Sequence, residues 1–244
     1  MEDIAVVGAL AGHDEKQVEL MEERIVVVDE EDRVVRPGSK KECHLNKNIA
    51  QGLLHRAFSV FLFDLEGRLL LQQRSDKKIT FPLYWANSCC SHPLHTPDEL
   101  EEEDGLGVKR AAVRKLGQEL GIPPEELPID EMVYLTRIHY KAQESGPWGE
   151  HEMDYVIVLQ AAVTLQPDPN EVKEARYFTE EELDTFLFSA EEKQVFVSPW
   201  FRHIQSMFLK KWWAALRDGT VASHKDHATI HRVGRSPSSN STTP

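Results

Sequence analysis

A short polar segment, residues 87–93, carries two cysteines and a histidine in the order Asn-Ser-Cys-Cys-Ser-His-Pro. A thiol and an imidazole this close together are suited to proton transfer or to nucleophilic attack. Cys90 and His92 are therefore the first candidates for catalysis. Small polar residues surround them, so we predict a loop, which is where catalytic groups are commonly placed. The alternative for Cys90 is a small buried apolar residue, and we assign Cys43 and Cys89 to that class.

A second polar group, Glu150-His151-Glu152, opens a segment with strand character. Strand periodicity places the two glutamates on one face and His151 on the other. Two carboxylates on one face repel each other unless a cation lies between them. A six-coordinate nitrogen and oxygen site for a divalent cation would be completed by three histidines from elsewhere in the sequence: His44, His55 and His92. A solvated strand edge is the alternative for the glutamates.

The chain is acidic, with a formal net charge of −13 over 244 residues. This charge argues against general nucleic-acid binding. An acidic protein that handles an anionic substrate needs local cations to offset its own field. Lys40, Arg74 and Lys78 lie in or beside loops near the polar segments, and they are suited to an anion such as diphosphate. Solvated surface charge is the alternative for each of them taken singly.

Three cysteines, two of them adjacent, do not form a disulfide framework and indicate a reducing compartment. No apolar run is long enough to span a bilayer. The acidic start of the chain lacks the pattern of a signal or transit peptide. We expect a cytoplasmic monomer, with a plastid as the second location if a transit peptide has been removed.

Hydrophobic periodicity predicts strands, one central helix, further strands and then helices. The expected strands are 24–28 and 34–35 (a hairpin broken at 37–41), 57–63, 69–74, 132–141, 150–163 and 177–178. The expected helices are 108–120, one beginning at the capping box 179–182, and 199–216. Residues 97–105 are acidic and expected to be solvated. This order predicts an α/β or α+β fold, with a mixed sheet packed between helices.

The domain organisation expected from composition is a single domain with two extensions. Residues 1–23 form an N-terminal extension with at most a short helix, residues 24–218 form the domain, and residues 219–244 form a C-terminal tail. The Ser, Thr and Pro content from Arg235 onward predicts disorder there. His224, His227 and His231 are assigned to the surface.

Several separate motifs occur in an order that resembles one family. They are Phe81-Pro82, the segment 87–93, Leu135-Thr136-Arg137-Ile138-His139-Tyr140, the segment Trp148-Gly149-Glu150-His151-Glu152-Met153-Asp154, and Ser198-Pro199-Trp200-Phe201. Together they resemble the type I isopentenyl-diphosphate isomerases of the Nudix superfamily, over about residues 29–218. The resemblance implies a Nudix-like mixed sheet between helices.

One departure from the Nudix hydrolases is informative. Their box has the form G-x5-E-x7-R-E-U-x-E-E-x-G-U, where U is aliphatic, and residues 114–122 align with its end. Lys115 and Gln118 replace two glutamates, while Arg114, Glu119 and Gly121 remain. Leu100 and Leu106 occupy the upstream glycine and glutamate positions. This loss of carboxylates argues against diphosphate hydrolysis and suits an enzyme that keeps its substrate's diphosphate intact.

The resemblance also implies roles for individual residues. It implies a divalent-metal site, with magnesium expected and manganese or zinc as alternatives, formed by His44, His55, His92, Glu150 and Glu152. It implies a second magnesium near Glu119, bound with the diphosphate. The implied diphosphate contacts are Lys40 (with Lys41 as the alternative), Arg74, Lys78 and the Ser91 backbone. The implied proton carriers are Cys90 and Glu152, with Tyr140 beside them and Trp200 lining the pocket.

The activity implied is the reversible isomerisation of isopentenyl diphosphate to dimethylallyl diphosphate, within isoprenoid biosynthesis. One group protonates C4 to give a tertiary carbocation, and a base on the opposite face removes a proton from C2. Two other classes remain to be distinguished. One is a Nudix pyrophosphohydrolase, which Lys115 and Gln118 disfavour. The other is a non-catalytic module with a structural zinc site, which five nitrogen and oxygen ligands disfavour, because such sites usually have four ligands.

Overall fold

The structure is a computed structural model that describes residues 10–144, 146–190 and 192–234. Within these residues, ten strands form one mixed sheet. The strands are β1 (Arg24–Val28), β2 (Val34–Ser39), β3 (Leu54–Phe63), β4 (Leu69–Arg74), β5 (Trp85–Asn87), β6 (Cys89–Ser91), β7 (Val133–Gln143), β8 (Gly149–Gln160), β9 (Val172–Phe178) and β10 (Ile230–Arg232). The helices are α2 (Glu15–Leu20), α3 (Lys40–His44), α4 (Asn46–Ala50), α5 (Leu106–Leu120), α6 (Glu180–Ala190), α7 (Pro199–Ile204) and α8 (Lys210–Arg217).

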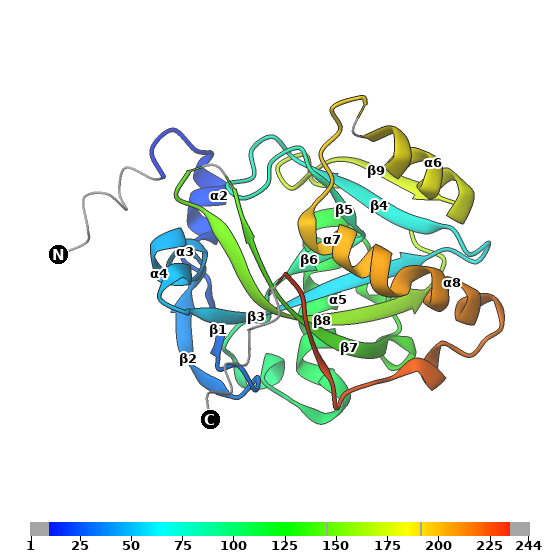
Figure 1. Cartoon of the computed structure of the whole chain (residues 1–244), viewed down its shortest axis with the longest axis horizontal. Helices are drawn as coiled ribbons and strands as arrows, with labels where there is room; N and C mark the ends of the chain where they lie inside the picture. The colour runs from blue at the N-terminus through cyan, green and yellow to red at the C-terminus, as the bar shows by residue number, and fades with distance from the viewer. Residues whose placement is uncertain (1–9, 145, 191, 235–244) are drawn as a thin grey trace, which may run out of the picture.

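The centre of the sheet is the strand β3, which is buried along its whole length. It runs parallel to β8, and β8 runs antiparallel to β7. The unbroken apolar run predicts this burial, since both faces of such a strand must be covered. Helix α5 covers one face, while α7 and α8 cover the other (Figure 1). The expected mixed sheet between helices is confirmed.

Two hydrophobic clusters reflect these two layers. The first packs side chains of β3, β7 and β8 against Phe201, Trp212 and Trp213, so the aromatic stripe of the C-terminal helices is core. The second packs the other side of the sheet against Ala112, Leu116 and other residues of α5. Helix α5 ends at Gly121, whose φ of 64° is the left-handed conformation that suits glycine.

The capping box predicted at the start of α6 is present. The Thr179 hydroxyl accepts from the Glu182 amide at 3.2 Å, and the Glu182 carboxylate accepts from the Thr179 amide at 2.9 Å. Pro199 is the first residue of α7, as predicted. Residues 199–217 are helical throughout, with a π-helical turn at Gln205–Leu209 between α7 and α8.

The predicted break of the first hairpin at 37–41 is wrong. Strand β2 continues to Ser39, and Pro37 pairs with Val26. Proline is tolerated because β2 lies at the end of the strand order, where one row of its backbone groups needs no partner. A Cβ atom on Gly38 would lie 2.8 Å from Val27 and 2.9 Å from the Cys43 sulfur, so close packing explains the glycine.

The loop predicted for 87–93 is also wrong in its centre. Cys89–Ser91 forms the short strand β6, which pairs with β3 so that Cys90 is opposite Ser59. Small polar residues fit here because the Ser88 hydroxyl replaces ladder contacts, accepting from the Leu62 amide at 2.8 Å and donating to the Leu70 carbonyl at 2.6 Å. Tertiary contacts thus override the weak strand propensity.

The acidic segment 97–105 is only partly solvated. Glu99 is buried and accepts from Arg114 at 2.6 and 2.9 Å, which fixes the segment against α5. The surface assignment is likewise wrong for His227, which is half-buried and stacks on Tyr134 with ring centroids 4.0 Å apart. Strand β10 then adds to β7, so part of the expected tail belongs to the sheet.

The disorder predicted from Arg235 onward lies outside the described residues. In the N-terminal extension, the described part holds the expected short helix, α2. Among the described residues, no helix has both the length and the apolar character required to cross a bilayer.

Candidate functional site

One cavity collects most of the residues singled out from the sequence. It is lined by Lys40, Arg74, Lys78, Thr80, Cys90, Ser91, His92, Glu119, Tyr140, Glu150, Glu152 and Trp200. Its volume is about 30 Å³. This is too small for a ligand of several heavy atoms, so lining groups must move outward to admit one.

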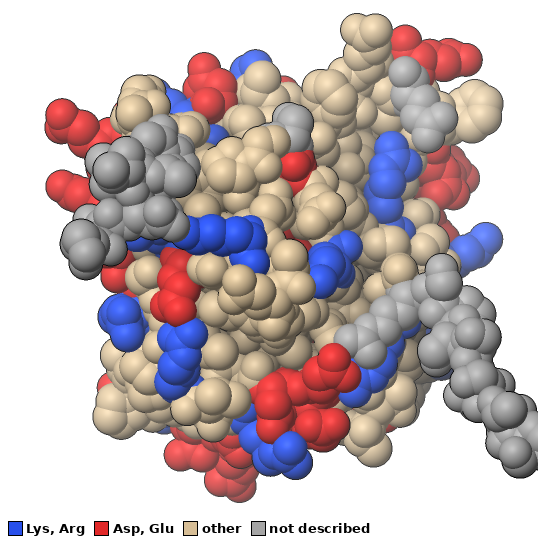
Figure 2. All heavy atoms as spheres, turned by 60° about the vertical axis from the view of Figure 1, so that its left-hand side comes forward, with Lys and Arg blue, Asp and Glu red and all other residues tan. Residues whose placement is uncertain are grey.

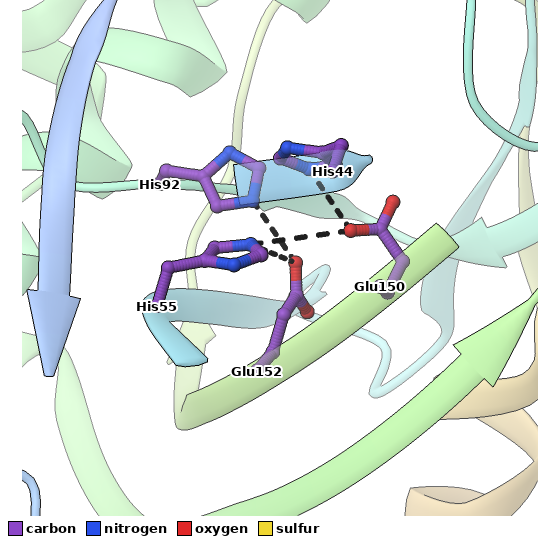
Figure 3. A group of neighbouring side chains, drawn as sticks. All are labelled: His44, His55, His92, Glu150 and Glu152. Atoms are coloured by element: carbon purple, nitrogen blue, oxygen red, sulfur yellow. Dashed lines mark hydrogen bonds and ion pairs between the residues drawn. The ribbon is translucent and has the colours of Figure 1, made fainter. Parts of the chain in front are cut away.

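Five buried side chains meet at one end of this cavity (Figure 3). His44 closes α3, His55 and Glu152 are direct neighbours on the parallel strands β3 and β8, and His92 directly follows β6. The fifth is Glu150, two residues before Glu152 on the same face of β8. One nitrogen or oxygen atom from each residue lies within 4.8 Å of all the others. The predicted alternation of the glutamates is confirmed, and these residues form a cluster that could hold a divalent metal.

The hydrogen bonding of the cluster fits a metal. His44 Nδ1 lies 2.6 Å from the Lys40 carbonyl and must donate to it, so its Nε2 carries a lone pair. That nitrogen lies 2.9 Å from Glu150 Oε2, and neither atom has a hydrogen-bond partner. Both ring nitrogens of His55 also lack one. Unpartnered buried lone pairs that face one another are costly, and a cation between them removes that cost.

Burial sets the protonation of this cluster. It lowers the pKa of His44 to about 4, and it lowers the pKa values of His55 and His92 as well. Neutral imidazoles are the form that binds metals. Burial also raises the pKa of Glu150 well above its usual range, and the nearby charge of Glu152 adds to this. Although burial alone would raise the pKa of Glu152, contacts with His55 and His92 hold it well below its usual range.

Cys90 lies farther along the cavity with its thiol held on two sides. Its sulfur donates to Asn87 Oδ1 at 2.9 Å and accepts from Trp200 Nε1 at 2.9 Å. Burial raises the pKa of Cys90 well above its usual value, and the charge of Asp154 adds to this. The group is therefore a neutral thiol, able to act as an acid, rather than a thiolate nucleophile.

Tyr140 is the direct cross-strand neighbour of Glu152. Its hydroxyl donates to Glu152 Oε2, while His92 Nε2 lies 2.9 Å from Glu152 Oε1. Burial raises the pKa of Tyr140 well above its usual value, so it stays protonated and donates. Trp200 packs edge-on against Phe81 with centroids 5.2 Å apart and gives the cavity an aromatic wall.

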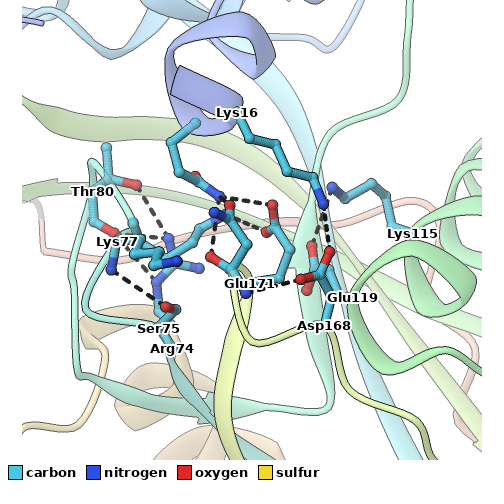
Figure 4. Close-up of polar contacts among 12 residues, drawn as sticks. Lys16, Arg74, Ser75, Lys77, Thr80, Lys115, Glu119, Asp168 and Glu171 are labelled. Atoms are coloured by element: carbon cyan, nitrogen blue, oxygen red, sulfur yellow. Dashed lines mark hydrogen bonds and ion pairs between the residues drawn. The ribbon is translucent and has the colours of Figure 1, made fainter. Parts of the chain in front are cut away.

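A second part of the cavity lining, here called the cationic end, consists of Lys40, Arg74 and Lys78. Figure 4 shows Arg74 of this group beside Thr80. Arg74 donates to the Thr80 carbonyl at 2.7 Å, which fixes the loop 80–81 around the guanidinium. Lys40 lines the cavity, whereas Lys41 forms an ion pair with Glu22 at 2.8 Å. Of the two alternatives, Lys40 is the one placed at the cavity. Burial, together with Lys78 and Lys115, lowers the pKa of Lys40 to about 8.

The altered Nudix box lies beside this cationic end. Lys115 is buried and its Nζ lies 3.3 Å from Glu119 Oε1. The charge of Glu119 is therefore neutralised by Lys115, which stands where the hydrolase box has a glutamate. Gln118 is exposed and points away from the buried face. Helix α5 therefore brings one carboxylate to the cavity, where the hydrolase box would supply several.

The structure also brings together residues that sequence reasoning missed. Asp154 continues the alternation of Glu150 and Glu152 and accepts from Ser59 at 2.8 Å beneath Cys90, so the period of two could have found it. Asn87 was part of the motif but had no assigned role. Glu171 pairs with Lys78 across 93 residues of sequence, and no local signal marks it.

Comparisons with known proteins agree with this geometry. A model of the NUDIX domain matches residues 53–201. The chain is 56% identical over 220 residues to Isopentenyl-diphosphate Delta-isomerase 1 of Bos taurus, which covers 90% of this chain and 96% of that relative. It is 50% identical over 225 residues to the Isopentenyl-diphosphate Delta-isomerase of Dictyostelium discoideum, which covers 91% of this chain and 94% of that relative.

Among solved structures, DR0079 from Deinococcus radiodurans aligns with a TM-score of 0.50 at 17% identity, covering 77% of this chain and 100% of that one, and it supports the fold alone. The fold and the box on α5 thus define a Nudix protein. Within that superfamily, the chain belongs to the isopentenyl-diphosphate Delta-isomerase family. The resemblance seen in the sequence motifs is confirmed.

Proposed function

We propose that this protein is an enzyme that converts isopentenyl diphosphate reversibly to dimethylallyl diphosphate, in isoprenoid biosynthesis. Relatives that align with this chain over nearly their whole length are named for this activity. The observation that carries the proposal is that Cys90 and Glu152 line one cavity, together with His92 and Glu150 of the histidine and glutamate cluster and with Lys40, Arg74 and Lys78. Such a cavity combines groups suited to a cation, groups suited to a diphosphate, and two acid/base groups.

The diphosphate is bound at the cationic end in this proposal. Arg74, Lys78 and Lys40 supply charge, and the Ser91 backbone supplies a further contact. Charge-assisted hydrogen bonds to phosphate oxygens are the strong class, and they fix the five-carbon chain toward Cys90 and Glu152. Glu119 is proposed to hold a magnesium ion that accompanies the diphosphate. Its pairing with Lys115 supports binding without hydrolysis.

Cys90 and Glu152 are proposed to carry the two protons of the reaction. An alkene is a weak base, so protonation at C4 needs a neutral acid held in position, and loss of a proton from C2 needs a base. The partly buried thiol is oriented by Asn87 and Trp200, and Glu152 is oriented by Tyr140. The Trp200 ring can stabilise the tertiary carbocation by about 2 kcal/mol in a desolvated site. The small cavity excludes the water that would trap this cation.

A divalent cation is proposed at the cluster His44, His55, His92, Glu150 and Glu152. Magnesium is the expected ion there, with manganese or zinc as alternatives for a donor set that includes three imidazoles. Glu152 would be held in place by such an ion, which would also lower its proton affinity.

The test is to incubate the purified protein with isopentenyl diphosphate and magnesium and to follow dimethylallyl diphosphate by NMR. We expect conversion to an equilibrium mixture with no release of phosphate. The Cys90→Ser variant is expected to lose about 10²-fold to 10⁴-fold in kcat, the range of general acid–base catalysis, while keeping its thermal unfolding curve. Release of phosphate without the isomer would instead identify a pyrophosphohydrolase and reject the proposal.

We further propose that the protein works as a monomer in the cytoplasm, with a plastid as the second location, and that it binds no nucleic acid. On the face drawn in Figure 2, acidic and basic side chains are interspersed, which supports the last point. Light scattering of the purified protein and fluorescence imaging of a tagged chain test the first two points. The division into residues 1–23, 24–218 and 219–244 also stays a proposal, tested by limited proteolysis.

A further inference from the structure

Glu171 is a buried carboxylate to which the proposed mechanism gives no role. It directly precedes β9, and its Oε2 lies 2.6 Å from Lys78 Nζ. Lys78 lines the cavity, whereas Glu171 is not among the lining residues. The carboxylate therefore contacts a lysine of the cavity lining without being part of that lining itself.

The second oxygen of Glu171 faces a different segment. Gln17 of α2 donates to Glu171 Oε1 at 2.8 Å and to Asn170 Oδ1 at 2.7 Å, and its side chain is buried. Lys16 also forms an ion pair with Asp168 in the same loop. One carboxylate thus joins a cavity lysine on one side to the N-terminal helix on the other.

Electrostatics keep this pair charged. Burial alone would raise the pKa of Glu171, but Lys78 and Lys115 hold it well below its usual range. Burial lowers the pKa of Lys78, and the charge of Glu171 opposes that shift. The charged groups that act on Lys78 are Glu171 before β9, Arg74 on β4, Lys115 and Glu119 on α5, and Lys40 on α3.

We propose that Glu171 is a positioning residue of the diphosphate site, which fixes the Lys78 ammonium at the cavity wall and joins it through Gln17 to helix α2. This inference rests on the proposed function, in which Lys78 binds the substrate's diphosphate. Glu171 does not touch the substrate, so its effect is on binding and not on the proton transfers.

Removing the Glu171 charge has two opposite consequences for an anion in the cavity. Loss of a nearby negative charge favours the anion, but the hydrogen bond of Lys78 then has only a neutral amide oxygen as acceptor, and Lys78 loses the counter-charge that keeps it protonated. A neutral amine donates far more weakly to phosphate than an ammonium does. The second consequence is the larger one because it acts at the contact itself, and it grows as the pH rises toward the pKa of Lys78.

The experiment compares Glu171→Gln with Glu171→Asp and with Glu174→Gln, which removes the same charge from an exposed position on β9. Calorimetry with inorganic diphosphate and magnesium gives Kd, and steady-state kinetics with isopentenyl diphosphate give KM and kcat. For Glu171→Gln we expect Kd and KM to rise about tenfold, the loss of one charged hydrogen bond, with kcat within about threefold of wild type. Glu171→Asp recovers part of the loss, and Glu174→Gln matches wild type.

The pH dependence separates positioning from a general loss of structure. We expect the deficit of Glu171→Gln to be larger at about pH 8.5 than at about pH 6.5, because deprotonation of Lys78 moves to lower pH. The inference is overturned if Glu171→Gln has the same Kd for diphosphate as Glu174→Gln. It is also overturned if Glu171→Gln lowers kcat alone and leaves Kd and KM unchanged. If Glu171→Gln does not fold, the variant Gln17→Leu is used for the test instead. Its Kd for diphosphate is expected to rise about threefold. An unchanged Kd would overturn the proposed link to α2.

Failure of the proposed function gives a different result. A wild-type protein that binds inorganic diphosphate but does not isomerise isopentenyl diphosphate rejects the proposed function, while the calorimetric comparison still decides the role of Glu171.

Discussion

Two groups of buried histidines lie on opposite sides of the β7–β8 pair, and they use their ring nitrogens differently. The metal-side group (His44, His55 and His92) faces Glu150 and Glu152, and four of its ring nitrogens have no hydrogen-bond partner. The back-side pair (His139 and His151) lies on the other face. There, His139 Nε2 lies 2.9 Å from His151 Nε2, and each ring also contacts a further group.

The back-side pair forms a directional chain of hydrogen bonds. His151 Nδ1 lies 2.7 Å from the Leu53 carbonyl and must donate to it, so its Nε2 accepts from His139. His139 Nδ1 then accepts from Arg232 at 2.7 Å. Two neutral imidazoles satisfy every one of these contacts. Burial alone therefore does not distinguish the two groups; the metal-side group is marked as a candidate metal site by its buried lone pairs that lack a donor.

Catalysis is where the two sides should differ most. Glu152→Gln is expected to lower kcat for isomerisation by about 10²-fold to 10⁴-fold, because it removes a proposed proton carrier at the metal side. His151→Asn changes the adjacent residue on the back side and is expected to keep kcat within about threefold of wild type. Product formation followed by NMR measures both. Near-normal turnover by Glu152→Gln would contradict the proposed catalytic role of the metal side.

Metal content gives the next largest difference. His55→Asn is expected to weaken retention of a divalent metal by at least about tenfold, since it removes one of five ligands, whereas the same substitution at His151 leaves retention unchanged. Elemental analysis after dialysis against a weak chelator measures the bound metal. Equal metal content in the two variants would show that the metal-side group is not a metal site.

In the metal-free protein, substitution on the back side is expected to cost more stability than substitution on the metal side. His139→Phe removes the donor to His151 and is expected to lower the free energy of unfolding by about 1–3 kcal/mol. His55→Phe replaces a ring whose nitrogens have no hydrogen-bond partner and whose Nε2 lies 3.4 Å from Glu152 Oε1, and it is expected to cost less stability than His139→Phe once metal has been removed. Urea denaturation of both variants decides the matter, and a larger loss for His55→Phe would contradict the difference drawn from their contacts.

The smallest effect is expected at the outer end of the back-side chain. Arg232 lies on β10 with a partly exposed side chain, and Arg232→Met should cost about 1 kcal/mol or less of unfolding free energy, with unchanged turnover. Denaturation and kinetics on the same preparation measure both quantities. A loss of turnover in this variant would mean that the back side contributes to catalysis after all.

Most of the fold could be predicted because its signals are local. The buried run of β3, the helical spacing of α5 and the capping box at Thr179 each act within a few residues. Strand β6 could not be predicted, because its small polar residues become a strand only through pairing with β3. The continuation of β2 through Pro37 depends on its position at the sheet edge, which the sequence does not display.

The candidate site divides in the same way. The face shared by Glu150 and Glu152 follows from strand periodicity. The three histidines were proposed from their side-chain chemistry, and the family resemblance implied the same set. Glu171 and the buried anchor Glu99 could not be found, because each acts on a partner from a distant or separate element. The choice between Lys40 and Lys41 also needed the structure, since it depends on which side chain the first turn of α3 directs inward.

Helix α3 is only five residues long, yet it carries a cavity lysine at its first position and a metal-cluster histidine at its last. The hydrogen bond from His44 to the Lys40 carbonyl closes this single turn. In the proposed function, a cation bound at His44 would therefore order the same backbone from which Lys40 would reach the diphosphate. Thermodynamic linkage then requires reciprocity: metal strengthens diphosphate binding, and diphosphate strengthens metal binding by the same factor. Metal and diphosphate would therefore be expected to bind cooperatively, with the coupling carried by the single turn of α3.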